Sequence, residues 1–274
     1  LNTIYQIPKP MRTKRKLSLI LLFSVFLFAF SIPDKIALKA FKHGEYLRYS
    51  VKYDLYLNIP VGSFELKLNE ERKEFNGQEC LHFSATGKTY KFYDNFFPVR
   101  DYFNAYVDPT TFRPRLFTRN VSEGDYSKKD YTIFFPEKKE VKNKKGQTFD
   151  IPENTWDILS VWYLARNFDY KNMTEGDSVN MHTFIDDESF PIGLKYLGTE
   201  QIKTSAGKIE CYVIKPLLIA GEIFKSEEDM TLYVSADENK IPVIIESGIS
   251  VGKVRAELED YQNLKNDFAA LVHK

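Results

Sequence analysis

The chain has 274 residues, and its 38 basic and 38 acidic side chains give a formal net charge of zero. The first 31 residues carry five basic and no acidic side chains, so the remaining 243 residues hold 33 basic and 38 acidic ones, a charge of −5. This balance argues against a nucleic-acid partner, which normally requires a concentrated basic face.

The N-terminal segment has the layout of a secretory signal peptide. Met11 precedes four basic residues, an apolar run over residues 17–32 and the small residues Ala29 and Ser31. A helix of this run reaches only ~24 Å, less than the ~30 Å of a bilayer core, so cleavage after Ser31 is favoured over a retained anchor. We expect an exported protein, periplasmic or associated with the outer membrane and soluble after cleavage, and we exclude residues 1–10, upstream of Met11, from the fold.

Short antiparallel strands are expected from Gly44 to about residue 135. Apolar and polar residues alternate with period two, and turn residues interrupt the alternation every eight to twelve positions. The pair Asn76 and Gly77, flanked by two such runs, is the sharpest hairpin signal.

A helix is expected over residues 153–169, with Asn154 as its cap. Four of its polar residues follow one another at every third position and form a mostly contiguous stripe: Asp157, Ser160, Tyr163 and Arg166. An ion pair between Arg166 and a carboxylate would anchor this helix to a sheet, and the same stripe would suit an anionic ligand.

Strands resume after this helix and repeat the pattern of the first half. Residues 61–80 align with 192–211, and residues 105–119 align with 232–246, with offsets of 131 at Cys80 and Cys211 and 128 at Pro114 and Pro242. We therefore predict an internal duplication. The two cysteines either form a disulfide, which requires Cα atoms within about 7 Å, or are buried thiols at equivalent positions of the two halves.

The fold class that follows is mainly β: an internally duplicated, strongly curved antiparallel sheet or incomplete barrel with one central linking helix. We expect one domain over residues 32–265, with halves at about 42–150 and 176–262 and a C-terminal tail at 266–274. Two flat sheets would leave exposed edges that invite aggregation, and curvature around the helix removes much of that liability.

Several short motifs occur in an order that resembles the exported bacterial family of unknown function DUF3108. They are an Arg-Asp pair before an aromatic strand, an Asp-Pro turn, a proline before the next strand, a basic residue before a Glu-Gly turn, and a helix of the form Asp-x-x-Ser-x-x-Tyr-x-x-Arg. Here they fall at Arg100 and Asp101, Asp108 and Pro109, Pro114, Arg119, Glu123 and Gly124, and at Asp157, Ser160, Tyr163 and Arg166. The resemblance covers roughly residues 42–262. It implies a periplasmic or surface-facing β protein, and it supplies no catalytic residues.

No pattern in the sequence indicates a catalytic residue, a cofactor or a metal ion. The four histidines belong to no recognisable catalytic motif. His82 is expected to face solvent or to make one structural hydrogen bond. The acidic run from Asp186 to Glu188 is more typical of a hairpin tip than of a calcium site. The carboxylates of Asp101, Asp108 and Glu123 leave a carbohydrate-active enzyme as a minority hypothesis.

Aromatic residues are crowded between positions 90 and 106. One interpretation is a ligand groove framed by Arg100 and lined by Tyr93, Phe97 and Tyr102, to which the helix residues Asp157, Tyr163 and Arg166 would contribute. The other is that the helix covers these rings, with Trp156 and Trp162 as a lid.

The sequence thus favours a non-enzymatic binding or transport-accessory protein of the cell envelope that holds a lipid, a glycan or a peptide in a concave β surface. The alternative is a structural or assembly partner of an outer-membrane system. A continuous apolar cavity would favour a lipid ligand, and an open shelf of aromatic side chains would favour a glycan. A filled interior would favour the structural role.

Overall fold

The computed structural model describes residues 38–54, 58–218, 230–248 and 252–273. The predicted signal peptide lies outside these residues. In the described part of the chain, no helix combines the length and the apolar character needed to cross a bilayer.

Most of the described chain forms strands, as the alternating pattern predicts. Nine strands precede the linking segment: β1 (Tyr46–Asp54), β2 (Asn58–Leu68), β3 (Lys73–Phe75), β4 (Gln78–Thr89), β5 (Arg100–Val107), β6 (Pro114–Glu123), β7 (Tyr126–Phe135), β8 (Glu140–Asn143) and β9 (Thr148–Asp150). Two 3-10 turns lie among them, η1 (Tyr93–Asn95) and η2 (Pro136–Lys138). Asn76 and Gly77 form the turn between β3 and β4 with φ of 51° and 76°, which confirms the predicted hairpin.

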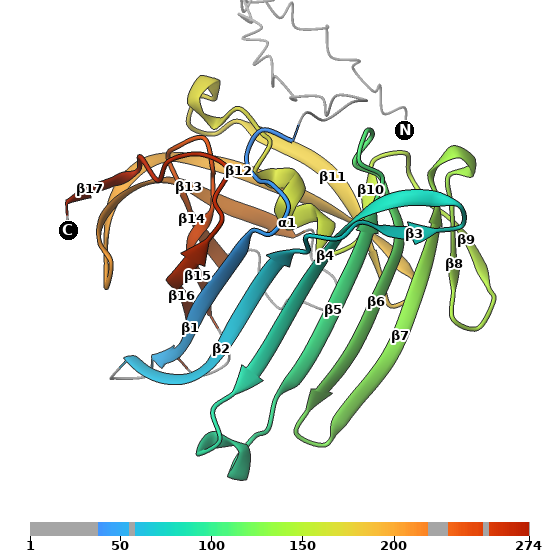
Figure 1. The fold of residues 1–274 in the computed structure, drawn as a ribbon, viewed down its shortest axis with the longest axis horizontal. Coiled ribbons are helices and arrows are strands. Elements are labelled where there is room, and N and C mark those ends of the chain that lie inside the picture. The colour runs from blue at the N-terminus through green and yellow to red at the C-terminus, as the bar shows by residue number, and fades with distance from the viewer. Residues whose placement is uncertain (1–37, 55–57, 219–229, 249–251, 274) are drawn as a thin grey trace, which may run out of the picture.

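The second half of the chain contains β11 (Ser178–Ile185), β12 (Glu188–Thr204), β13 (Gly207–Leu218), β14 (Met230–Ser235), β15 (Pro242–Gly248), β16 (Lys253–Gln262) and β17 (Leu271–His273). Antiparallel pairing connects β9 to β4 through consecutive strands, then β4 to β2, β2 to β1, β1 to β16, and β16 back to β11. The result is one large curved sheet that does not close, with β3 and β17 attached as extra partners of β4 and β13. Figure 1 shows the two halves of this sheet bending around α1.

The linking segment differs from the predicted helix over 153–169, and that prediction is wrong in its bounds. Residues Thr155–Trp156 form β10, which pairs in parallel with β11 and makes the sheet mixed. The helix α1 covers only Ser160–Ala165, and the 3-10 turn η3 (Tyr170–Asn172) follows it. Pairing of Thr155 with His182 and of Trp156 with Thr183 provides backbone hydrogen bonds from a distant strand, which override the local helical pattern.

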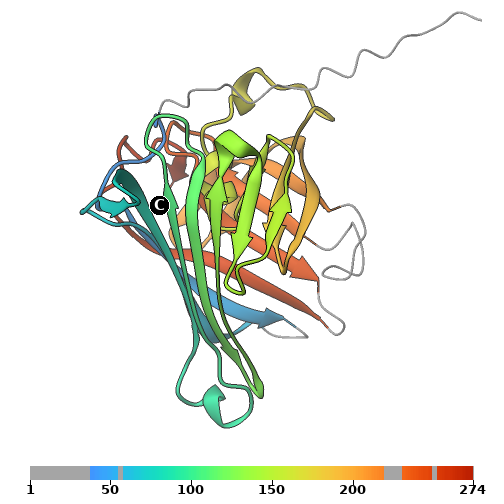
Figure 2. The ribbon, with the colours of Figure 1, turned by 90° about the vertical axis from the view of Figure 1, so that its right-hand side faces the viewer.

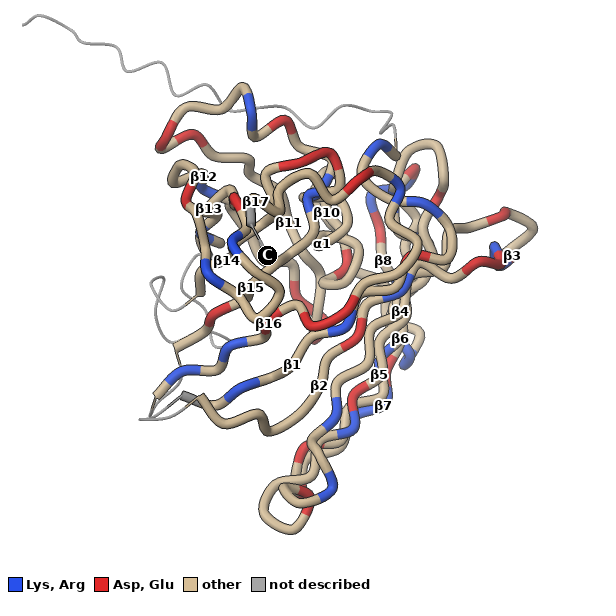
Figure 3. The backbone as a smooth tube through the Cα atoms, turned by 60° about the vertical axis from the view of Figure 1, so that its left-hand side comes forward, with Lys and Arg blue, Asp and Glu red and all other residues tan. Residues whose placement is uncertain are grey.

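The core lies between α1 and the concave face of the sheet. Tyr163 of α1 packs its ring 4.0 Å from that of Phe83 on β4 and 5.3 Å from that of Phe41, which precedes β1. A smaller second cluster, around Ile209, Cys211 and Val243, lies among β13, β15 and the segment before β17. Charged residues of both signs are interspersed along the strands (Figure 3).

The two free ends of the sheet are held together by side chains rather than by strand pairing. The turn between β11 and β12 contains Asp186 and Asp187, and Asp186 forms ion pairs with Arg119 of β6 and Lys128 of β7. Asn143 of β8 donates to Asp187 across 2.9 Å. We call these contacts of Asp186 and Asp187 the seam. The position of both residues in the turn between β11 and β12 confirms that the acidic run is a hairpin tip.

Candidate functional site

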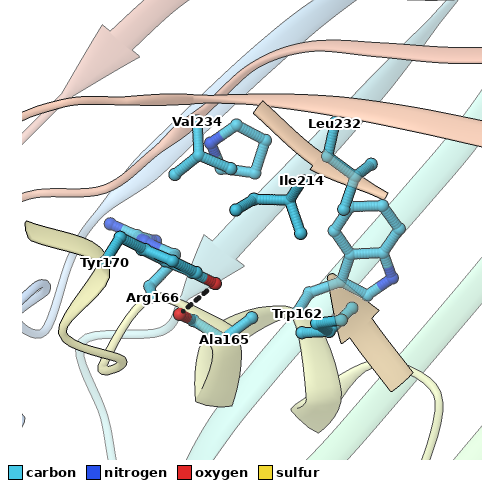
Figure 4. A pocket seen from close by; sticks show the side chains of 9 residues that line it. Trp162, Ala165, Arg166, Tyr170, Ile214, Leu232 and Val234 are labelled. Atoms are coloured by element: carbon cyan, nitrogen blue, oxygen red, sulfur yellow. Dashed lines mark hydrogen bonds between the residues drawn. The ribbon is translucent and has the colours of Figure 1, made fainter. Parts of the chain in front are cut away.

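A small apolar cavity lies between α1 and the second half of the sheet. It has a volume of about 20 Å³ and is lined by Trp162, Ala165, Arg166 and Tyr170 from the linking segment and by Leu194, Ile214, Leu232, Val234 and Pro242 from the strands. Figure 4 shows these side chains around it, with the hydroxyl of Tyr170 donating to the carbonyl of Ala165 at 2.9 Å. A hollow of this size holds about one water molecule, so it is too small to be a ligand site by itself.

Apolar residues continue from this cavity across the concave face of the sheet. Six of them lie directly opposite one another on successive strands and therefore share one face: Tyr196, Ile214, Leu232, Ile245, Ala256 and Val51. We call this set the apolar row. It runs from β12 through β13, β14, β15 and β16 to β1.

Part of the apolar row is not fully covered. Val51, Ile245 and Trp162 are half-buried and pack against the core, while Leu232 and Ile214 are buried. Part of the apolar surface of Val51, Ile245 and Trp162 therefore stays in contact with water.

Arg166 fastens the end of α1 to the start of β1. Its guanidinium contacts Glu45 at 2.5 and 2.8 Å and donates to the carbonyls of Asn239 and Ala40 at 3.1 and 3.2 Å. Burial by itself would lower the pKa of Arg166, but the Glu45 carboxylate outweighs this and raises it. The predicted ion pair between this arginine and a carboxylate is confirmed.

Tyr163 lies beside this ion pair, with its ring 5.5 Å from the guanidinium carbon, and Asp157 is buried at the other end of α1. Asp157 accepts hydrogen bonds from the backbone N–H groups of Leu159 and Ser160 and so caps the start of α1, while burial raises its pKa to about 6 in spite of these bonds. The hydroxyl of Tyr163 is buried without a hydrogen-bond partner among the described residues, and Tyr49 on β1 shares this property.

The other four predicted ligand residues lie elsewhere, around the turn between β4 and β5. Tyr93 belongs to η1, Phe97 is 55% exposed, and Tyr102 projects from the convex face of β5 with 46% exposure. Arg100 forms an ion pair with Asp94 at 2.6 Å. Figure 1 shows this turn at the far end of long hairpins, away from α1.

The structure thus brings Tyr163 and Arg166 together, places Asp157 at the start of α1, and separates all three from the aromatic turn. The idea that the helix and its tryptophans cover these rings is wrong. Trp156 is fully buried, donates to the carbonyl of Phe112 at 2.9 Å and stacks on Arg113. Ligand binding by the seven predicted residues stays a prediction.

The sequence interpretation missed the apolar row and the Glu45 partner of Arg166. Alternation marked each row member as apolar, but the pairing of β1 with β16 over about 200 residues places Val51 next to Ala256. The sequence named Asp101, Asp108 and Glu123 only as candidate carboxylates. In the structure, burial first and then Glu123 raise the pKa of Asp101 to about 6.

A second, open hollow of about 450 Å³ lies at the ends of β1, β2 and β16. Its lining is mostly polar: Gly44, Glu45, Tyr46, Lys67, Leu68, Asn69, Glu70, Gln262 and Asn263. It has no cluster of apolar side chains of the kind that ligand sites use.

The order of motifs seen in the sequence is matched by a family model. The model described as "Protein of unknown function (DUF3108)" matches residues 48–259. The chain belongs to the DUF3108 family. This match spans the curved sheet from β1 to β16, together with α1 and the apolar row. No curated protein matches the chain.

Two solved structures match the chain at low sequence identity. One is a β-barrel-like protein of the domain of unknown function DUF1849 from Brucella abortus, with a TM-score of 0.54, 9% identity, and coverage of 82% of this DUF3108 chain and 99% of the other. Another is a DUF1089 family protein from Pseudomonas aeruginosa, with a TM-score of 0.39, 10% identity, and coverage of 72% and 94%. The first similarity concerns the fold alone.

Proposed function

We propose that this protein is a non-enzymatic binding module that holds the acyl chain of a lipid against the apolar row. The observation that carries the proposal is the partial exposure of Val51, Ile245 and Trp162 next to the buried members of the apolar row. Apolar side chains left accessible inside a curved sheet favour an apolar ligand, because its binding removes their surface from water.

The chemistry around the apolar row favours a lipid over a glycan or a peptide. The lining of the cavity beneath Trp162 is almost entirely carbon, with the Arg166 guanidinium already engaged by Glu45 and two carbonyls. A glycan or an extended peptide requires several free hydrogen-bond partners in its site, whereas an acyl chain requires none.

Two alternatives rest on different observations. The filled region around Tyr163 and Phe83 suits a structural or assembly role in which the concave face is only core. A glycosidase rests only on the carboxylates of Asp101 and Glu123, where burial and then Glu123 raise the pKa of Asp101 to about 6.

The proposal places the protein in the cell envelope after export. The support is the signal-like segment around Met11, which lies outside the described residues. Mass determination of the protein recovered from its native cells tests this part: loss of residues 1–31 agrees with export and cleavage, and an intact N-terminus contradicts cleavage.

Internal duplication belongs to the same proposal. The strands β1, β2, β4, β5, β6 and β7 follow one another in the sheet as β11 to β16 do. The thiols of Cys80 and Cys211 lie 3.6 and 3.7 Å from the carbonyl oxygens two residues earlier, at Gln78 and Ile209. Both observations are what a duplication produces, and superposition of the halves tests it.

Binding of a fluorescent long-chain fatty acid to the purified protein tests the ligand assignment. Ile245→Gln places a polar group in the apolar row and should weaken binding about tenfold. This loss of binding free energy is what we expect when part of one apolar side chain is no longer buried by the ligand. Tyr102→Gln is the control, because it removes a large side chain from the convex face, away from the apolar row. Equal affinity of both variants, or no binding by the unaltered protein, would reject the proposal.

A further inference from the structure

The turn between β4 and β5 presents aromatic rings that no other part of the described chain covers. Phe92, Phe96 and Phe97 are 67%, 76% and 55% exposed, and Tyr93 contacts Phe92 edge-on at 5.1 Å. We call these four residues the aromatic tip. Figures 1 and 2 show that it ends a pair of long hairpins that project from the body of the sheet.

The aromatic tip is held in place by hydrogen bonds. Asp94 accepts from the hydroxyl of Thr89 at 2.7 Å and from Arg100 at 2.6 and 3.0 Å, which closes the base of the turn. The neighbouring turn between β6 and β7 supports it, since the N–H of Gly124 donates to the carbonyl of Pro98 at 2.8 Å. A Cβ at Gly124 would come within 2.8 Å of the Phe97 ring, so only glycine permits this contact. These hydrogen bonds and the contact with Gly124 therefore hold the turn that carries the exposed rings.

We propose that the aromatic tip docks the protein onto the surface of a lipid bilayer. The three exposed phenylalanines together offer roughly 400 Å² of accessible surface, from about 200 Å² per ring. A stable protein complex buries about 800 Å² on each partner, twice that amount. A projecting point of this size fits a deformable bilayer interface, where aromatic side chains insert at the level of the headgroups.

The charges beside the aromatic tip are close to balanced. Arg100 is paired with Asp94 and Lys128 with Asp186, and the remaining lysines of the two turns are interspersed with acidic residues in the sequence. We therefore expect the rings to contribute most of the binding, with little dependence on anionic lipid. The inference concerns a docking surface and does not rest on the ligand proposal.

Flotation of the exported, processed protein with vesicles of phosphatidylcholine and phosphatidylglycerol tests the inference. The unaltered protein should float, and the double variant Phe92→Ser with Phe96→Ser should lower the ratio of bound to free protein at least about tenfold. Tyr131→Ser with Val272→Ser removes two exposed apolar side chains elsewhere, at 38% and 40% exposure, and should float like the unaltered protein.

A spectroscopic readout reports directly whether the aromatic tip enters the bilayer. In a Phe96→Trp variant, brominated phospholipid should quench the added tryptophan on vesicle binding, and in a Tyr131→Trp variant it should not. Failure of the unaltered protein to float, or equal flotation of all variants together with equal quenching, overturns the proposal and leaves the fatty-acid binding assay unaffected.

Discussion

Arg166 and Glu45, 121 residues apart in the chain, form a two-contact ion pair in the interior, with nitrogen to oxygen distances of 2.5 and 2.8 Å. The pair joins the end of α1 to the residue before β1, and Phe41 and Tyr163 place their rings 5.2 and 5.5 Å from the guanidinium carbon. The position of α1 inside the curved sheet therefore depends on a connection between the linking segment and the N-terminal strand.

Replacing Arg166 with methionine should destabilise the protein strongly. The Glu45 carboxylate would stay buried without its partner, and such a loss costs about 3 to 5 kcal/mol of the free energy of unfolding. Urea denaturation measures this. Lys139→Met, which breaks an exposed pair with Glu153, is the control and should change the free energy by less than about 1 kcal/mol. A loss below that value for Arg166→Met would contradict the anchoring role.

Asp186→Asn should loosen the seam between the two ends of the sheet. Asp186 has a φ of 54°, a conformation that asparagine tolerates, so the substitution removes the charge that pairs with Arg119 and Lys128 without straining the turn. We expect faster hydrogen exchange of the backbone amides in β8 and in the β11–β12 turn, and a loss on the order of 1 kcal/mol. Unchanged exchange in both segments would show that the seam does not hold the ends together.

Asp101 should make stability fall as the pH rises from about 4 to 6. Its pKa is near 3.8 in the unfolded chain and about 6 in the folded protein, chiefly because of burial and then because of Glu123. Between these values the folded protein keeps a proton that the unfolded chain has lost, so deprotonation favours unfolding. We therefore compare the free energy of unfolding of Asp101→Asn with that of the unaltered protein. This difference should favour the variant by about 1 to 3 kcal/mol more at pH 7 than at pH 4.

The comparison is made by urea denaturation at both pH values. Asp157 also has a pKa raised to about 6, mainly by burial, so the unaltered protein and the variant retain that common contribution and only their difference reports Asp101. The same difference at pH 4 and pH 7 would show that the carboxyl of Asp101 titrates normally.

Both cysteines should remain reduced and unreactive in the folded protein. Cys80 and Cys211 are free and buried, which rejects the disulfide alternative. Burial, followed by nearby acidic groups, raises the pKa of Cys211 to about 12, and burial also raises the pKa of Cys80, so little thiolate exists at neutral pH. A thiol reagent should modify neither cysteine in buffer and both in urea. Rapid modification of either one in buffer would contradict this burial.

The local sequence contained enough information for the strands and the tight turns. Asn76 and Gly77 form the predicted hairpin turn because both residues accept positive φ, and His82 makes the expected hydrogen bond, to Asn104 at 2.9 Å. These features depend on neighbours in the chain or on the adjacent strand.

Features that depend on distant pairing could not be predicted. Trp156 belongs to a strand because it pairs with β11, and the sequence of residues 153–169 does not predict this pairing. The apolar row likewise requires the register of β1 against β16, which sets Val51 opposite Ala256. Alternation indicates which residues are apolar, but curvature and register decide which of them face one another.

Quenching of tryptophan fluorescence by a brominated fatty acid tests the lipid site most directly. Trp162 lines the cavity beside the apolar row and is half-buried, whereas Trp156 is fully buried against Phe112. We expect saturable quenching of the unaltered protein and no such quenching of the Trp162→Phe variant. Absence of quenching, or equal quenching in the Trp162→Phe variant, would contradict an acyl chain bound against this row.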